Sequence, residues 1–305
     1  MKHAILSLSS ALILAGCANS FAKGETPSEA LGCTLSSQDT AVLEQWRQDG
    51  FSEQQTDDAA NAFANCLGHP DPFLRDRIGY EGLTVALRSG NITEATRRDL
   101  ISQLSQNLGV EDADGFVAPF SALALSELVR TDRVDPFLTA EERADISSRA
   151  ASYLSGVSDY RAFSDSEGWR HGVAHGADIA MQLALNPNVT TASLERLRQA
   201  ISQQITNRSG YAFRHSEPER LARPIYFMAT RGAFESETWT AWFETLSDPA
   251  PLSDWNEAYQ SEAELARLHN LKAFARVLYV NASLSEDEAL QPIADGALNM
   301  LRSLP

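Results

Sequence analysis

One pattern runs through almost the whole chain and limits what it can fold into. Apolar residues recur at intervals of three and four, and the runs begin after capping residues and end near Gly or Pro. Thr93 precedes a run that contains Leu100, and Thr139 and Glu142 form the capping box of another. No alternation of apolar and polar residues is long enough to predict a strand. The pattern therefore predicts an all-α fold over residues 36–305.

The spacing of these runs indicates how the helices are arranged. They are joined by short polar turns, and no linker interrupts the series after residue 35. Antiparallel helix pairs of about 40 residues are the units of HEAT and armadillo stacks. We therefore expect a single domain, a superhelical stack of antiparallel helix pairs. A closed α/α toroid would give the same pattern and is the alternative.

The N-terminus has the layout of an export signal. Lys2 supplies a positive start, residues 4–14 are apolar but too short to span a bilayer, and small residues follow. Leu-Ala-Gly before Cys17 resembles a bacterial lipobox, which predicts a signal peptide over 1–16 and acylation of Cys17. Residues 17–35 are then a flexible tether. Cleavage after Ala22, which would release a soluble periplasmic protein, is the alternative.

Both cleavage schemes place the body of the protein outside the cytoplasm, on the periplasmic side of the bacterial envelope. The several acyl chains of a lipoprotein would tether it to a membrane, and Ala18 in place of an aspartate favours the outer one. In an oxidising compartment, Cys33 and Cys66 are expected to form a disulfide, because Cys17 is explained by lipid. Two buried free thiols are the alternative.

Charge and motifs exclude several classes of function. Lys and Arg number 25 against 41 Asp and Glu, a formal net charge of -16, so the chain would repel a nucleic-acid backbone. The sequence contains no GxSxG nucleophile elbow, no phosphate-binding Walker loop and no GxGxxG after a strand. No cofactor is predicted on these grounds.

Two histidines and an aspartate stand out within a helix expected over residues 168–185. On a helical wheel His171, His175 and Asp178 fall within about 60° of one another. They are the candidates for catalysis, and weak candidates for zinc binding, because imidazoles four residues apart can bind one ion. The stretch lacks the Glu of a metalloprotease motif. Buried, hydrogen-bonded histidines that only define packing are the alternative.

Glycines accompany this polar stripe. Gly172 and Gly176 lie four residues apart on a neighbouring stripe, where each costs about 1 kcal/mol relative to alanine in a helix interior. Close approach of another helix is the ordinary reason for such a cost. We therefore expect the histidines to lie near an adjacent helix.

Several phrases of the sequence resemble a known family. LRDRIGYEGL, FSALALSEL, Asp-Tyr-Arg, GWRHGVAHGAD and HSEPERLA, in this order, are similar to an uncharacterised bacterial helical family, domain of unknown function 2785, over about residues 70–280. The resemblance implies an armadillo-like fold but no reaction. This chain differs from the family pattern at Pro119, where family members more typically have a polar residue. Besides the histidines and Asp178, it implies these binding positions: Arg75, Asp76, Tyr80, Glu81, Asp159, Arg161, Trp169, His215, Glu219 and Arg220.

Two functions fit these observations. The first is a binding protein that holds a small molecule, or an envelope protein or glycan, on the concave face of the stack. The alternative is an envelope hydrolase, in which His171 or His175 is the general base and Asp178, Asp76 or Glu219 orients it, with possible assistance from a metal.

Overall fold

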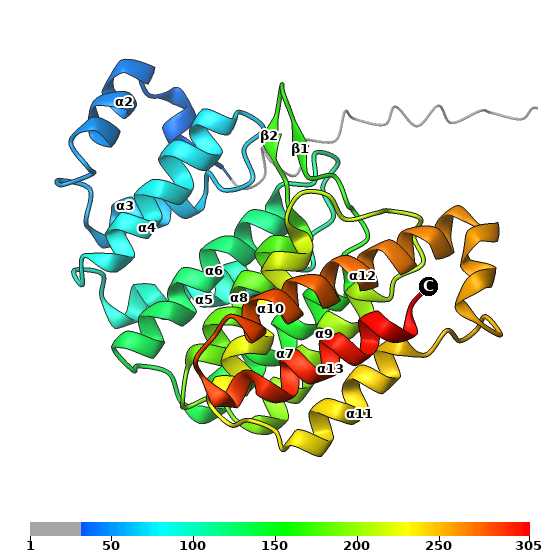
Figure 1. The fold of residues 1–305 in the computed structure, drawn as a ribbon. Coiled ribbons are helices and arrows are strands. Elements are labelled where there is room, and N and C mark those ends of the chain that lie inside the picture. The colour runs from blue at the N-terminus through cyan, green and yellow to red at the C-terminus, as the bar shows by residue number, and fades with distance from the viewer. Residues whose placement is uncertain (1–31) are drawn as a thin grey trace, which may run out of the picture.

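The computed structural model describes residues 32–305 and is almost entirely helical (Figure 1). The α-helices are α2 (Thr40–Gln48), α3 (Asp57–Ala64), α4 (Glu81–Arg88), α5 (Glu94–Asn107), α6 (Val117–Val134), α7 (Ala140–Gly156), α8 (Gly172–Leu185), α9 (Thr191–Ile205), α10 (Glu217–Thr230), α11 (Ser236–Ser247), α12 (Glu262–Ser283) and α13 (Gln291–Ser303). The tighter or wider turns are η1 (Thr34–Ser37), η2 (Phe73–Tyr80), η3 (Trp255–Gln260) and η4 (Glu288–Leu290), of which η2 is a π-helix.

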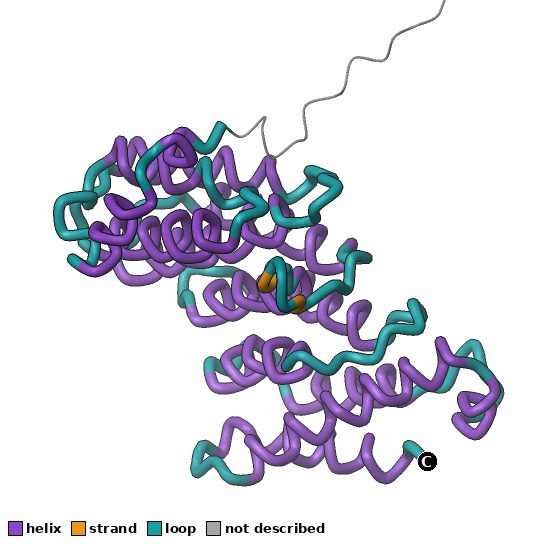
Figure 2. Tube along the Cα trace, turned by 90° about the horizontal axis from the view of Figure 1, so that it is seen from above, coloured by secondary structure: helices purple, strands orange, loops and turns teal. Residues whose placement is uncertain are grey.

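The helices form a stack of two layers that stays open (Figure 2). Helices α4, α6, α8, α10 and α12 pack on one another in sequence and form layer A. Helices α3, α5, α7 and α9 cover them as layer B, and α11 and α13 complete the end of the stack. The all-α helical-repeat fold is confirmed. The stack does not close on itself, as the toroid would require.

Local sequence signals set many of the helix ends. The Thr93 hydroxyl accepts a hydrogen bond at the start of α5, and Thr139 and Glu142 form the expected capping box of α7. Each such cap contributes about 1 kcal/mol because it satisfies a backbone N–H that the helix leaves free. Pro218 lies in the first turn of α10, where no N–H partner is needed.

The N-terminal end of the fold is held by a disulfide. Cys33 and Cys66 are bonded, as expected, and both are buried. Leu35 is also buried, so packing begins a few residues before the expected boundary at 36. Cys17 and Ala22, with the rest of the expected signal and most of the tether, lie outside the described residues. Within residues 32–305, no helix combines the length and the apolar character that crossing a membrane requires.

A small hairpin between α7 and α8 differs from the expectation. Strands β1 (Phe163–Ser164) and β2 (Gly168–Trp169) pair antiparallel, and α8 starts only at Gly172. The helix expected over residues 168–185 is therefore wrong at its start. Gly168 has φ of +73°, which suits the turn that closes the hairpin, and His171 has φ of 59°, a left-handed conformation that ends the loop.

Candidate functional site

Arg75 binds the backbone of the β1–β2 hairpin. Its side chain is fully buried in η2. Nε donates to Asp76 Oδ1 at 2.7 Å, and Nη1 donates to the carbonyl oxygens of His69 and Pro70 at 3.2 and 3.1 Å. Nη2 donates to the carbonyl oxygen of Glu167 at 2.7 Å and to Asp76 Oδ2 at 3.4 Å. These contacts use all five N–H groups of the guanidinium, so none remains for a ligand.

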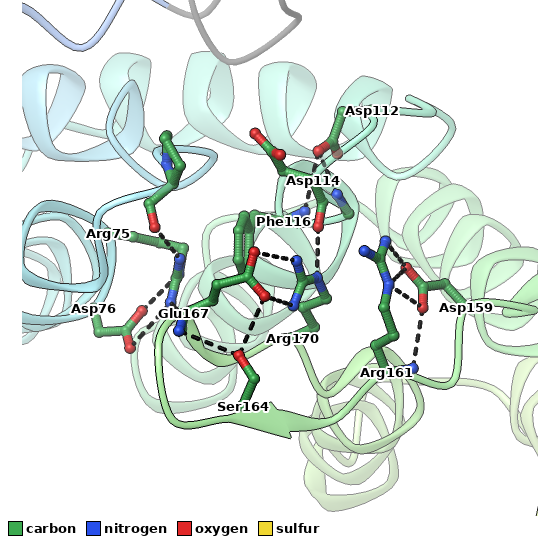
Figure 3. Close-up of polar contacts among 12 residues, drawn as sticks. Arg75, Asp76, Asp112, Asp114, Phe116, Asp159, Arg161, Ser164, Glu167 and Arg170 are labelled. Atoms are coloured by element: carbon green, nitrogen blue, oxygen red, sulfur yellow. Dashed lines mark hydrogen bonds and ion pairs between the residues drawn. The ribbon is translucent and has the colours of Figure 1, made fainter.

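Phe116 lies between two guanidinium groups (Figure 3). The Cζ atoms of Arg75 and Arg170 are 3.9 and 4.3 Å from the centroid of its ring. Arg170 also donates to the carbonyl oxygen of Asp114 at 2.5 Å and to both carboxylate oxygens of Glu167. Desolvated cation–π contacts contribute about 2 kcal/mol each. This cluster therefore fastens the hairpin to the N-terminal end of α6.

Asp159 and Arg161 pair with each other beside this cluster (Figure 3). Arg161 Nε donates to both carboxylate oxygens at 2.9 Å, and this pairing keeps the pKa of Asp159 below its ordinary value despite partial burial. A Cβ added to Gly115 would lie 2.6 Å from both side chains. Asp112 accepts the N–H groups of Gly115, Phe116 and Val117 and so caps α6.

Trp169, His171 and His215 form a partly exposed aromatic group. The rings of Trp169 and His171 stack with centroids 4.5 Å apart, and Trp169 is 39% exposed. His171 Nε2 lies 2.7 Å from the carbonyl oxygen of His215, so this nitrogen carries the proton and donates it. Burial lowers the pKa of His171. The imidazole is therefore neutral near pH 7.

His175 is more deeply buried. Its Nδ1 donates to the carbonyl oxygen of Pro119 at 3.1 Å, and its ring contacts Phe120 and His171. Burial, and then the nearby His171 and Arg220, keep the pKa of His175 well below its ordinary value. A neutral histidine that is 5% exposed is better placed for packing than for proton exchange with a substrate.

Asp178 is neutralised by a partner from α10. Arg220 Nε donates to Asp178 Oδ1 at 2.9 Å, and Nη2 binds the second carboxylate oxygen. Burial raises the pKa of Asp178, and Arg220 opposes that rise. Burial raises the pKa of Tyr80, and the nearby negative charges of Glu127 and Asp178 raise it further.

The remaining two candidate residues lie at the surface. Glu81 accepts a hydrogen bond from Arg77 at 2.7 Å, one turn earlier, and Glu219 is exposed on α10. The spacing of Glu81 and Arg77 is that of an ordinary helix-surface ion pair. The position of neither residue indicates a binding role.

These residues come together but do not enclose a large space. The cavity against His171 has a volume of about 10 Å³, room for one water, and neither His175 nor Asp178 lines it. Within residues 32–305, no three His, Cys, Asp or Glu side chains are placed to hold a metal ion. The geometry therefore does not support the zinc-binding hypothesis for His171, His175 and Asp178.

The glycines of α8 act as expected. A Cβ on Gly172 would lie 3.3 Å from Tyr153 Oη, and one on Gly176 would lie 3.0 Å from Leu154 Cδ1. Both neighbours belong to α7, so the glycines allow α7 and α8 to approach closely, and this prediction is confirmed. The Tyr153 hydroxyl donates to the carbonyl oxygen of Gly172 at 3.3 Å.

A large cavity lies next to these residues, in layer B. The space between the C-terminal halves of α5 and α7 has a volume of about 800 Å³, and Asp159 and Gly172 belong to its wall. A second cavity of about 410 Å³ continues between the same helices towards Leu138, and both share Ser105, Gln106 and Arg149. We call the two together the α5–α7 groove.

Small residues keep the groove open. Ser148, Ser152 and Gly156 follow one another at intervals of four on α7 and line its wider part, and Ser105 and Gly109 line it from α5. None of these side chains is long enough to bridge the two helices. These residues are not among the candidates predicted from the sequence, and their four-residue spacing is the signal that marks them.

The comparisons with known proteins bear on the family alone. A sequence profile with the description "Protein of unknown function (DUF2785)" matches residues 104–280, which include the hairpin and α8. The stretch with Arg75 and Tyr80 lies outside the matched residues. No curated protein and no solved structure matches the chain. The matched residues make up more than half of the chain, which therefore belongs to this family.

Proposed function

We propose that the protein is a binding protein that holds a small ligand in the α5–α7 groove. The observation that carries the proposal is the volume of the wider cavity, about 800 Å³. Pockets for small molecules typically have volumes of about 300–1,000 Å³, with mostly apolar walls and a few polar groups. Here Leu108, Val157 and Tyr153 supply apolar surface, and Ser148 and Ser152 supply hydroxyl groups.

The contacts of the histidines favour binding over hydrolysis. A general base must reach the proton that it removes, directly or through one water. His175 is nearly sealed, and the space beside His171 holds about one water. Asp178 is already paired with Arg220, so it is not available to orient either imidazole.

The ligand in the groove would lie beside the polar residues expected from the sequence and not among them. Asp159 and Gly172 line the groove, and the carbonyl oxygen of Pro119, another wall residue, accepts the hydrogen bond of His175. The side chains of Arg75, Arg170, His171 and His175 therefore hold the wall of the groove in place. On this proposal these four are positioning residues.

Export and lipid anchoring belong to the same proposal. Their support is the lipobox-like sequence at Cys17 and the disulfide between Cys33 and Cys66, which suits an oxidising compartment. We expect acyl labelling in cells that is lost in Cys17→Ser. An unlipidated mature protein starting at residue 23 would instead support cleavage after Ala22.

The binding proposal is tested by thermal-shift measurements on the purified protein with a panel of envelope oligosaccharides, peptides, amino acids and polyamines. Ser152 is exposed on α7 and lines the groove, so Ser152→Trp should fill the groove and abolish any ligand-induced shift. Gln203→Trp, at an exposed position of α9, is the matched control and should keep the shift.

A second variant distinguishes the alternative site. Trp169 is exposed on the hairpin and does not line the groove, so Trp169→Ala should preserve binding. Loss of the shift in Trp169→Ala together with its retention in Ser152→Trp would contradict the proposal and place the ligand on the aromatic group.

A further inference from the structure

The shape of the α5–α7 groove restricts the ligand that it can hold. The two cavities are joined at Ser105, Gln106 and Arg149 and extend along both helices. Their lining on α7 runs from Glu141 to Gly156, which at about 1.5 Å per residue is roughly 22 Å. An elongated ligand therefore fits the groove better than a compact one.

The charges along the groove are mostly negative. Arg98 and Arg149 are the cationic side chains in its lining. The carboxylate residues in the same lining are Glu111, Asp112, Asp159, Glu141, Glu142 and Asp145. An excess of carboxylates in a partly enclosed groove attracts cations.

Most of these carboxylates already have partners. Asp112 caps α6, Asp159 pairs with Arg161, Glu142 pairs with Arg98, and Asp145 pairs with Arg149. The pairs with Arg98 and Arg149 also occupy both cationic groups of the lining.

Two carboxylates of the lining remain. Among the described residues, Glu111 and Glu141 have no side-chain hydrogen bond or ion pair, and both are exposed. Glu111 follows the C-terminus of α5, and Glu141 is in the first turn of α7. The uncompensated negative charges therefore lie towards opposite ends of the groove.

Helix ends of both signs border the wide end of the groove. Both α5 and α7 end there, at Asn107 and Gly156, while α6 and α8 begin there, with Ala118 and Gly172 in the lining. The C-terminus of a helix carries about half a negative charge and the N-terminus about half a positive one. These partial charges offset one another, so Glu111 provides the net negative charge that favours a positive group of the ligand at this position.

Ser105 is an independent sign that the groove is built for a ligand. It is 8% exposed, it lines both cavities, and its hydroxyl is buried with no hydrogen-bond partner in the described structure. A buried hydroxyl without a partner costs about 1–3 kcal/mol. The oxygen itself has almost no accessible surface, so the side chain must turn about its Cα–Cβ bond before a donor group of a ligand at the junction of the two cavities can remove that cost.

We infer that the ligand of the α5–α7 groove is a linear organic cation, with ammonium groups joined by methylene segments, as in a polyamine. Its ammonium groups lie near Glu111, Ser105 and Glu141. Its methylene segments lie against the apolar parts of the wall, such as Leu108 and Ile101. The inference rests on the proposed binding function and specifies its ligand class.

Isothermal titration calorimetry on the purified protein tests the inference, with spermine, tetraethylene glycol and suberate as probes. All three are elongated, and they are respectively cationic, neutral and anionic. Spermine should bind at about 20 mM salt and weaken several-fold at about 500 mM, because salt screens exposed charges. Putrescine should bind more weakly than spermine because it reaches only one end of the groove.

The variants distinguish the groove from general attraction to an acidic protein. Glu111→Gln and Glu141→Gln should each weaken spermine binding about 2- to 5-fold. Ser105→Ala should weaken it by a similar factor, and Ser152→Trp should abolish it. Glu286→Gln, at an exposed position outside the groove, removes the same charge and should leave binding unchanged.

The outcomes separate this inference from the proposed function. No spermine binding, or equal weakening by Glu286→Gln and Glu111→Gln, would overturn the inference. Tighter binding of suberate or tetraethylene glycol that is lost in Ser152→Trp would also overturn it, while it would support the binding function. Absence of any ligand-induced shift that depends on Ser152 would instead count against the binding function itself.

Discussion

The helix pairs of layer A and the α5–α7 pair of layer B differ in the polar side chains that lie between the helices. In layer A, polar side chains bridge each neighbouring pair of helices, for example Arg88 to Glu127 between α4 and α6 and Arg220 to Asp178 between α10 and α8. In layer B, Arg98 and Glu142 bridge α5 and α7 near their N-terminal ends, and beyond that pair the two helices face each other with serines and glycines and leave the groove between them. Long, charged residues thus act as internal ties, while short ones leave space for a ligand.

This difference separates residues that stabilise the fold from residues that can meet a ligand. Arg75 is the extreme of the first kind, since it is buried and all its donors are used. Ser105 is the extreme of the second, because its buried hydroxyl has no partner. Substitutions in the two layers should therefore differ in their effect on stability.

The largest loss of stability is expected from Arg75→Met, in the η2 turn that leads into α4 of layer A. The substitution leaves the carbonyl oxygens of His69, Pro70 and Glu167 without their donor, and removal of one partner from a buried charged network costs about 3–5 kcal/mol. Urea unfolding followed by circular dichroism measures it. Arg77→Met, in an exposed pair, should change stability by less than about 1 kcal/mol.

A pH dependence of stability should follow from His175, the buried imidazole of α8. The folded-state pKa of His175 is lowered, so the unfolded chain binds its proton first, and stability is present above about pH 6.5 and is lost as pH falls. His175 should contribute up to about 1.4 kcal/mol of loss per pH unit below pH 6. Urea midpoints from pH 7 to 5 should show a shallower slope in His175→Phe. An unchanged slope would mean that His175 is protonated in the fold.

A smaller contrast is expected between two serines. The Ser147 hydroxyl donates to the carbonyl oxygen of Arg143 at 2.6 Å, so Ser147→Ala should cost about 1 kcal/mol. Ser105 has no partner, so Ser105→Ala should not lower the free energy of unfolding and should raise it by up to about 1–3 kcal/mol, the cost of the unpaired hydroxyl. Equal losses in the two variants would show that Ser105 is bonded in solution.

The smallest change in stability is expected from substitutions at exposed positions of the groove. Ser148→Trp and Ser152→Trp place a large ring in open space and should each change stability by about 0.5 kcal/mol or less. Differential scanning calorimetry measures the change. A loss of several kcal/mol would mean that the groove closes in solution.

Helical periodicity and capping residues made the fold predictable. Thr93 and Thr139 act where the sequence indicated, and Gly172 and Gly176 allow the close approach of α7 and α8. These features depend on contacts within one helix or between neighbours, which spacing in the sequence reports directly.

The start of α8 and the groove were not predictable in the same way. The hairpin depends on the contacts of Arg75 and Arg170 with Glu167, and the contact from Arg75 joins residues 92 positions apart. The groove depends on α5 and α7 staying apart beyond the ion pair of Arg98 with Glu142 near their N-terminal ends, and a gap between two helices leaves no direct signal in the sequence. The polar residues could therefore be predicted from the sequence, but not which of them are paired with other residues in the folded protein.

A crystallographic fragment screen of the protein tests the central claim most directly, because it requires no knowledge of the ligand. The account predicts that bound fragments gather in the α5–α7 groove, against Ser105 and Ser152. Fragments that gather on Trp169, His171 and His215 and leave the groove unoccupied would contradict it.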